Sequence, residues 1–177
     1  MEAGIDTGPV AYRASFAIDD ADTGLSLTAK CGRQGVPLLW RLVADAARDP
    51  SSIPALEQDL GRRRYFGREV PNEGSVIWAA PASEVVGFVR AADYGPFDSP
   101  WGIPRARLGG RAIGIAKASL TGEKADQPPG AVGRSLEGGA VMVAAADEWV
   151  AVRRMWRDGR SLSPREVCST GDRFDDV

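Results

Sequence analysis

The chain has 177 residues, of which 44% are hydrophobic and 26% charged, so it suits one ordinary domain or two small ones, and disorder throughout is excluded. The formal net charge of -2 gives no electrostatic reason to expect nucleic acid or an anionic membrane as the default partner. No apolar run reaches the length of a membrane helix, and the N-terminus has no cationic segment followed by an apolar stretch. Neither membrane insertion nor secretion is therefore expected.

Cysteine and histidine usage narrows the possible chemistry. Cys31 and Cys168 lie far apart without CxxC spacing, so neither a metal site nor a disulfide framework is indicated, and a reducing cytoplasm is expected. The sequence contains no histidine. A site built by this chain alone therefore lacks the side chain best matched to proton transfer near neutral pH.

The first fifty residues predict a strand followed by a helix. Apolar and polar side chains alternate from Pro9 to Ile18, which is the period-two signature of a strand. Aspartates at 19, 20 and 22 with Thr23 then supply capping groups, so a helix is expected to begin near Asp22. Pro37 removes a backbone donor within this helix and is expected to kink or break it.

The middle of the chain predicts a linker, a short helix and a loop. The stretch from Ile53 to Asn72 contains four arginines and no sustained period, so it is interpreted as a linker with a domain boundary inside it. A strand-like piece at 74–78 follows, and Pro81 then opens a short amphipathic helix. The stretch DYGPFDSPWGIP at 93–104 is rich in Gly and Pro and predicts a loop.

The remainder predicts an all-β domain. Short strands are expected within RAIGIAKASL, GAVGRSL, AVMVAAA and WVAVRRMW, separated by Gly- and Pro-rich turns. This pattern is typical of a small antiparallel barrel or sandwich. Residues 161–177 are expected to form a polar tail with a capped helical turn at Ser163 and loose last residues.

The stretch AGIDTGPVAYRASFAIDDADTGLSL resembles the N10-formyltetrahydrofolate-dependent formyltransferases. That family includes methionyl-tRNA, sugar-amine and siderophore hydroxyornithine formyltransferases. The stretches RRYFGREVPNEGSVIW, SEVVGFVRAADYGPF, GGRAIGIAKA and PPGAV are similar to its linker, its bridging helix and its C-terminal barrel. The resemblance spans roughly residues 3–156.

The resemblance implies an α/β remnant followed by an all-β domain. Residues 1–52 would end a Rossmann-like catalytic domain, 53–72 would be a linker, and 73–160 would hold the bridging helix and an OB-like β-barrel. The family's catalytic Asn, His and Asp trio transfers here onto Asp6 alone, and folate contacts transfer onto Gly4, Ile5 and Asp6. Because the Asn and His lie upstream in the family, we expect a truncated enzyme that is inactive alone and binds N10-formyltetrahydrofolate weakly, with no metal.

Three groups of candidate residues each have a structural alternative. The first is Asp6 in GIDTGP, which the resemblance implies to be catalytic and which is otherwise a turn residue beside Gly8. Arginines at 62, 63, 64 and 68 with Tyr65 and Phe66 are typical of a nucleic-acid surface, or of a solvated linker anchored by two aromatic rings. The third group lies in the loop at 93–104 and either borders an acceptor pocket or forms a hydrophobic plug between domains: Tyr94, Phe97, Asp98 and Trp101.

The charge balance bears on the acceptor. Residues 71–177 carry 13 Lys plus Arg and 14 Asp plus Glu, whereas binding a nucleic-acid backbone calls for a basic face. A small amine, either a hydroxyornithine-type siderophore precursor or an amino sugar, is therefore favoured over methionyl-tRNA. The tRNA alternative stays open because of a local basic cluster at Arg153, Arg154, Arg157 and Arg160, which is otherwise a solvated strand end.

Two further expectations follow. An unpaired strand at Pro9 to Ile18 would expose an edge and an apolar face, so self-association is expected of the isolated chain. The alternative to an enzyme is a non-catalytic module that binds a partner protein, a nucleic acid or a full-length paralogue.

Overall fold

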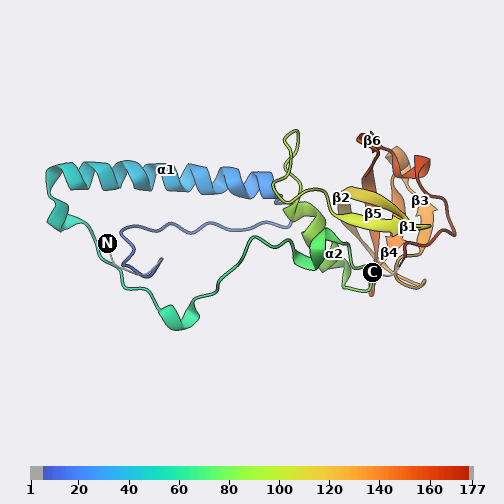
Figure 1. Cartoon of the computed structure of the whole chain (residues 1–177), viewed down its shortest axis with the longest axis horizontal. Coiled ribbons are helices and arrows are strands. Elements are labelled where there is room, and N and C mark those ends of the chain that lie inside the picture. Colours follow the sequence, from blue (N-terminus) through green and yellow to red (C-terminus); the bar gives the residue numbers. More distant parts are fainter. Residues whose placement is uncertain (1–5, 176–177) are drawn as a thin grey trace. The chain divides into compact units, whose positions relative to one another are not determined.

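The computed structural model describes residues 6–175, and the chain divides into two units (Figure 1). Unit 1 comprises Met1–Asp22 and Ser26–Arg68, and unit 2 comprises Thr23–Leu25 and Glu69–Val177. The division at residues 68 and 69 falls inside the stretch interpreted as a linker.

Unit 1 is built on one long helix. Helix α1 spans Gly24–Arg48, close to the beginning predicted from the aspartate-rich stretch. The predicted break at Pro37 is wrong, because the helix continues through it as one element. The φ angle of proline is helical, and the carbonyl that loses its partner lies one turn earlier, in an exposed stretch that water can reach. After α1 only short 3-10 turns occur in unit 1, at Pro50–Ser52 and Leu60–Arg62.

The predicted strand from Pro9 to Ile18 is not a strand. The segment is extended, but its only bridge within the described chain joins Val10 to Leu56. Its side chains contact α1 instead: the Tyr12 hydroxyl donates to Asp45, and the Arg41 guanidinium carbon lies 4.3 Å from the Tyr12 ring centre. Alternation predicts an extended backbone, but a strand also needs a neighbouring strand for its hydrogen bonds.

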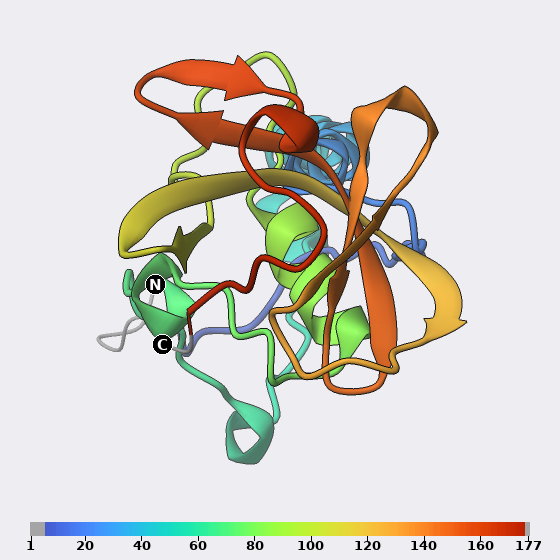
Figure 2. The same cartoon turned by 90° about the vertical axis from the view of Figure 1, so that its right-hand side faces the viewer.

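Unit 2 is a curved antiparallel sheet with one helix. Helix α2 spans Ala82–Ala91, and the six strands are β1 Arg105–Leu108, β2 Arg111–Lys124, β3 Val132–Ser135, β4 Val141–Ala144, β5 Glu148–Arg157 and β6 Arg160–Leu162. The strand order is β1-β2-β5-β4-β3, and β6 pairs with β5. Figure 2 shows the strands curving around the end of α2. The predicted helix after Pro81, the loop at 93–104 and the antiparallel sheet are confirmed.

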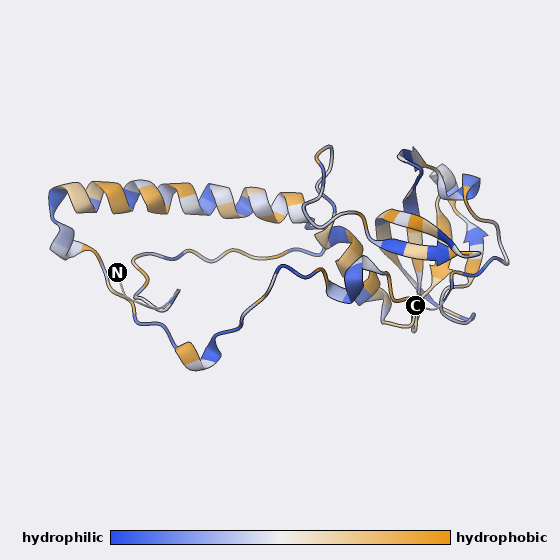
Figure 3. Ribbon diagram, in the orientation of Figure 1, coloured by the Kyte–Doolittle hydropathy of each residue, from blue (hydrophilic) through white to orange (hydrophobic). Residues whose placement is uncertain are grey.

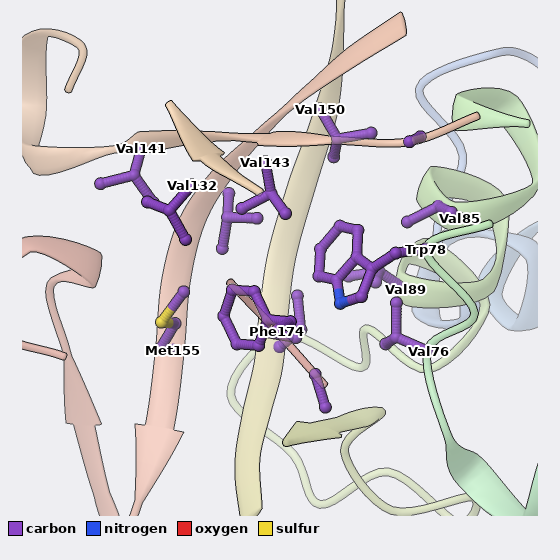
Figure 4. Close-up of a cluster of buried hydrophobic side chains, with 14 of the residues drawn as sticks. Val76, Trp78, Val85, Val89, Val132, Val141, Val143, Val150, Met155 and Phe174 are labelled. Atoms are coloured by element: carbon purple, nitrogen blue, oxygen red, sulfur yellow. The ribbon is translucent and has the colours of Figure 1, made fainter. Parts of the chain in front are cut away.

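The core of unit 2 lies between α2 and the sheet. Val85 and Val89 of α2 meet buried valines of β4 and β5, and the Trp78 and Phe174 ring centres are 5.4 Å apart (Figure 4). The buried side chains of α2 recur every three to four residues, as the sequence pattern predicts, whereas every residue of β4 and the run Trp149–Val152 of β5 is buried. Unit 2 thus has its own hydrophobic core.

The expected loose tail is part of this core. Cys168 is 5% exposed and Phe174 is fully buried. The Phe174 N–H donates to the Gly130 carbonyl beside β3 at 2.9 Å, and the Asp175 N–H donates to the Arg107 carbonyl of β1 at 2.8 Å. The segment therefore bonds to both ends of the strand order, which pattern analysis of its polar sequence missed. An OB-like barrel and a Rossmann remnant stay predictions.

Candidate functional site

Asp6 lies in an exposed turn of unit 1. Its φ is 56°, and the Gln58 side-chain amide donates to the carbonyls of Asp6 at 3.2 Å and Gly8 at 2.6 Å. This anchors the turn without engaging the Asp6 carboxylate. Gly4 and Ile5, the other residues predicted to contact folate, lie outside the described residues.

A shallow hollow of about 700 Å³ surrounds Asp6. Its lining includes Arg13 and the residues 62–66, so the structure brings the arginine and aromatic cluster next to Asp6. Tyr65 is 85% exposed and Phe66 is 83% exposed. Neither ring is buried, so the two rings do not anchor this stretch within the described residues, while its exposure agrees with a solvated linker.

A second hollow, of about 460 Å³, lies in unit 2 beside the loop at 93–104. Tyr94, Phe97 and Asp98 line it, so three of the four loop residues expected to border an acceptor pocket come together. Trp101 is not on its lining and is 46% exposed. The sheet contributes residues that the sequence did not single out as a site, namely Lys117, Trp156 and Ser161, together with Arg154.

The charges in this hollow are fixed by the pairing of β2 with β5. Lys117 and Arg154 are register partners at an irregularity in this pairing. Like charges facing each other across strands are destabilising unless they are compensated. Lys117 Nζ lies 4.0 Å from a carboxylate oxygen of Asp93, and Arg154 donates to the Ser161 hydroxyl at 3.2 Å. The two cations line the same hollow as Trp156, which is 38% exposed.

Tyr94 has a packing role as well. The Leu25 N–H donates to the Asp93 carbonyl at 3.1 Å, and a Cβ added at Gly24 would lie 2.6 Å from the Tyr94 ring. Phe97, by contrast, is 66% exposed. Both alternatives for this loop therefore find support, since Tyr94 packs against Gly24 while Phe97 faces the solvent side of the hollow.

The predicted basic cluster is divided between β5, which holds Arg153, Arg154 and Arg157, and β6, which begins at Arg160. Arg153 donates to the Ser119 hydroxyl at 2.9 Å, and Arg157 lies 3.9 Å from the Asp158 carboxylate. Of the four arginines only Arg154 lines the hollow.

Residues 6–175 contain neither a metal-binding cluster nor a membrane-spanning helix. These residues contain no group of three or more His, Cys, Asp or Glu arranged to hold a metal ion. No helix within the same range combines the length and apolarity needed to cross a bilayer.

Comparison with known proteins places these features in a family. The formyl transferase C-terminal domain family matches residues 70–170, which is most of unit 2. The methionyl-tRNA formyltransferase of Pseudomonas fluorescens strain SBW25 is 30% identical over 159 residues, covering 90% of this chain and 47% of the relative. The methionyl-tRNA formyltransferase of Dehalococcoides mccartyi is 30% identical over 172 residues, covering 97% of this chain and 50% of the relative. The chain thus spans about half the length of the curated relatives it matches.

Solved structures share the fold. HypX from Aquifex aeolicus, in a substituted variant, has a TM-score of 0.64 and 19% identity and covers 94% of this chain, which corresponds to 29% of HypX. HypX in complex with tetrahydrofolic acid has a TM-score of 0.59 and 18% identity. The family match over residues 70–170 shows that the chain belongs to the formyltransferase family and carries its C-terminal domain.

Proposed function

We propose that this chain is part of an enzyme that transfers a formyl group from N10-formyltetrahydrofolate to the amine of methionyl-tRNA. The observation that carries the proposal is the match of 90% of the chain to a methionyl-tRNA formyltransferase. The hollow with Lys117, Arg154 and Trp156 supports a nucleic-acid acceptor, because cations that contact phosphate and rings that stack on bases are the elements of such sites.

Asp6 is the proposed catalytic residue. An amine that attacks a formyl carbon produces an oxyanion and an ammonium, so the site needs a hydrogen-bond donor and a proton acceptor. A carboxylate orients and stabilises a neighbouring imidazole. Because this sequence contains no histidine, an imidazole beside Asp6 has to come from residues outside it.

The described residues do not by themselves fit a folate. Sites for ligands of this size are concave and mostly apolar with a few placed polar groups. The hollow at Asp6 is shallow, and charged side chains make up much of its lining: Asp6, Arg13, Glu57, Asp59, Arg62, Arg63 and Arg64. The donor is therefore proposed to bind mainly to the half of the relatives that this chain does not span.

The acceptor is tested by binding to the purified chain. We expect methionyl-tRNA to bind with an affinity that falls as salt rises, and Arg154→Glu to weaken binding several-fold because it reverses a phosphate-contacting charge. Arg165→Glu is the matched control, since Arg165 is an exposed arginine of unit 2 outside this hollow. Equal effects of the two substitutions, or binding that is indifferent to salt, would contradict the tRNA assignment.

The activity is tested in a fusion of this chain to the unmatched half of the Pseudomonas fluorescens relative. Formyl transfer to methionyl-tRNA is followed by mass spectrometry of the released amino acid. We expect transfer that Asp6→Asn abolishes and Asp20→Asn preserves, because Asp20 is an exposed aspartate of the same segment. Transfer by the Asp6→Asn fusion would refute the role of Asp6.

A small amine is the second candidate acceptor. It is supported by the balance of 13 basic and 14 acidic residues over 71–177, which gives this part no net positive charge. The same fusion distinguishes the two acceptors when amino sugars and N-hydroxyornithine replace the tRNA. A role in siderophore biosynthesis has no support among the matched relatives, and a cytoplasmic location stays a prediction.

A further inference from the structure

The charges that line the hollow beside the loop at 93–104 are balanced. Lys117 and Arg154 come from strands β2 and β5, and Asp93 and Asp98 come from the loop. Contact with a nucleic-acid backbone depends on cations that are free to meet phosphate. The number of phosphates that the hollow can hold therefore depends on how each cation is already paired.

The carboxylate of Asp93 is fixed by its surroundings. The residue follows α2, whose hydrophobic residues lie in the core of unit 2 and alternate with hydrophilic ones in Figure 3. The Asp93 N–H donates to the Arg90 carbonyl at 3.0 Å, and the Asp93 carbonyl accepts from the Leu25 N–H at 3.1 Å. One carboxylate oxygen accepts from the Gly95 N–H at 2.9 Å. The negative charge is thus held in one place before any ligand binds.

Lys117 is the mobile member of its ion pair with Asp93. Its Nζ lies 4.0 Å from the second carboxylate oxygen, and its side chain is 52% exposed, compared with 18% for Asp93. The negative end of the α2 dipole lies beside Asp93 and also favours an ammonium there. Exposed pairs of this kind change an equilibrium by up to about 5-fold. Asp93 thus decides, within that limit, where the Lys117 charge lies.

Arg154 differs from Lys117 in its partner. It donates to the Ser161 hydroxyl at 3.2 Å, and within residues 6–175 it forms no ion pair with a carboxylate. A guanidinium has five N–H donors, so donors remain for an anion. Trp156 lines the same hollow, and an exposed ring of this kind stacks on a base. Arg154 and Trp156 together offer one charge contact and one stacking surface.

We propose that Asp93 is a positioning residue that holds Lys117 away from the acceptor. The hollow then engages a single nucleotide unit, with one phosphate on Arg154 and one base on Trp156. Its volume of about 460 Å³ lies in the range of small-ligand sites. The nucleic-acid nature of this acceptor comes from the proposed function, whereas the limit on its contacts comes from Asp93.

The pairing of Asp93 with Lys117 is tested first in the free chain. A water-soluble carbodiimide activates a carboxyl group, which then forms an amide with an adjacent lysine amine, and mass spectrometry of a digest identifies the joined peptides. We expect Asp93 to be joined to Lys117. Lys30 with Asp19, at 2.7 Å, is the internal control. Joining of the control pair alone, or of Lys117 to Asp98, would overturn the pairing.

The effect on the acceptor is tested with Asp93→Asn, which removes the charge and keeps an oxygen for the Gly95 N–H. We expect methionyl-tRNA to bind about 2- to 5-fold more tightly. The plot of log affinity against log salt is expected to steepen by about 0.7–0.9, because one more cation meets phosphate. Thermal unfolding establishes that the variant keeps its fold.

Two comparisons separate this effect from a general change of charge. Asp126→Asn is the matched control, because Asp126 is an exposed aspartate of unit 2 outside this hollow, and it is expected to change the affinity by less than about 1.5-fold. In a Lys117→Gln background, Asp93→Asn is likewise expected to change the affinity by less than about 1.5-fold, because no ammonium remains to be released.

Adenosine monophosphate tests the single-nucleotide site without tRNA. Its binding is followed by the NMR signal of the Trp156 indole N–H, which is assigned with Trp156→Phe. We expect this signal to shift on addition of the nucleotide, and Asp93→Asn to tighten the binding by about 2- to 5-fold. Arg154→Glu is expected to weaken it several-fold.

The outcomes distinguish the role of Asp93 from the proposed function. Equal effects of Asp93→Asn and Asp126→Asn on tRNA binding, or an Asp93→Asn effect that persists in the Lys117→Gln background, would overturn the role of Asp93 and leave the proposed function standing. Nucleotide binding that Asp93→Asn tightens, in a chain that does not bind methionyl-tRNA, would support Asp93 and count against the proposed function. Binding of neither ligand would overturn both.

Discussion

Replacing Phe174 by alanine tests whether the C-terminal segment belongs to the core. Phe174 is fully buried, and its ring centre lies 5.4 Å from that of Trp78. Burying such a ring contributes about 1.5–3 kcal/mol, and the cavity left behind raises the cost of Phe→Ala to about 3–5 kcal/mol. At about 4 °C per kcal/mol for a domain near 100 residues, the melting temperature of unit 2 falls by about 12 °C or more.

The assay is urea and thermal unfolding followed by near-ultraviolet circular dichroism, which reports tryptophan packing in unit 2. Phe97→Ala is the control, since Phe97 is 66% exposed and its removal is expected to cost less than about 0.5 kcal/mol. A loss below about 1 kcal/mol for Phe174→Ala would refute the packing argument and restore the loose tail that the sequence predicts.

Three further predictions use local geometry and titration. Gly24→Ala is expected to destabilise the protein by about 1–3 kcal/mol in the same thermal unfolding assay, because a Cβ there would lie 2.4 Å from a backbone oxygen of α2. Gly32→Ala is the control: no atom lies within 4 Å of a Cβ added there, so it is expected to stabilise the protein by up to about 1 kcal/mol. The hydrogen bond from Lys30, together with those from the Asp19 N–H and the Ser26 hydroxyl, lowers the pKa of Asp22 from its ordinary value of 3.8 to about 2. The order at the beginning of α1 is therefore expected above pH 3.8 and is lost as the pH falls through about 2, which an acid titration by NMR measures. Loss of this order near neutral pH would contradict the prediction. Burial raises the pKa of the Cys168 thiol to about 11, whereas Cys31 is exposed. Iodoacetamide at about pH 8 is therefore expected to modify only Cys31 in the native chain. Two alkylated cysteines in the mass spectrum would refute this prediction.

Local patterns predicted the elements that depend on local interactions. The aspartates before Gly24 predicted the beginning of α1, and Pro81 with its apolar spacing predicted α2. The longer strands were predicted because each lies in an apolar stretch bounded by Gly- and Pro-rich turns. Strands β1 and β6 were missed because their short arginine-containing sequences, RARL and RSL, hold no apolar run.

Features that depend on distant contacts were not predictable in the same way. The polar sequence of residues 169–175 suggested a loose end, but its backbone bonds to β1 and to Gly130 decide its position. The residues of the candidate site likewise include some that the sequence identified and some that depend on distant contacts. Tyr94 and Phe97 were found as aromatics in one loop, whereas Lys117 and Arg154 face each other only because β2 pairs with β5 in one register.

Helix α1 shows why unit 1 depends on something beyond itself. Two interior glycines cost about 1 kcal/mol each relative to alanine, and Pro37 costs about 3 kcal/mol, so α1 gives up about 5 kcal/mol of intrinsic helix stability. Exposed ion pairs such as Arg41 with Asp45 return only about 0.3–0.5 kcal/mol each. Most helical stability in proteins comes from packing an apolar face. Since no side chain of α1 is buried, offsetting this cost would require packing of its exposed apolar residues, Val36, Leu39, Trp40 and Val43.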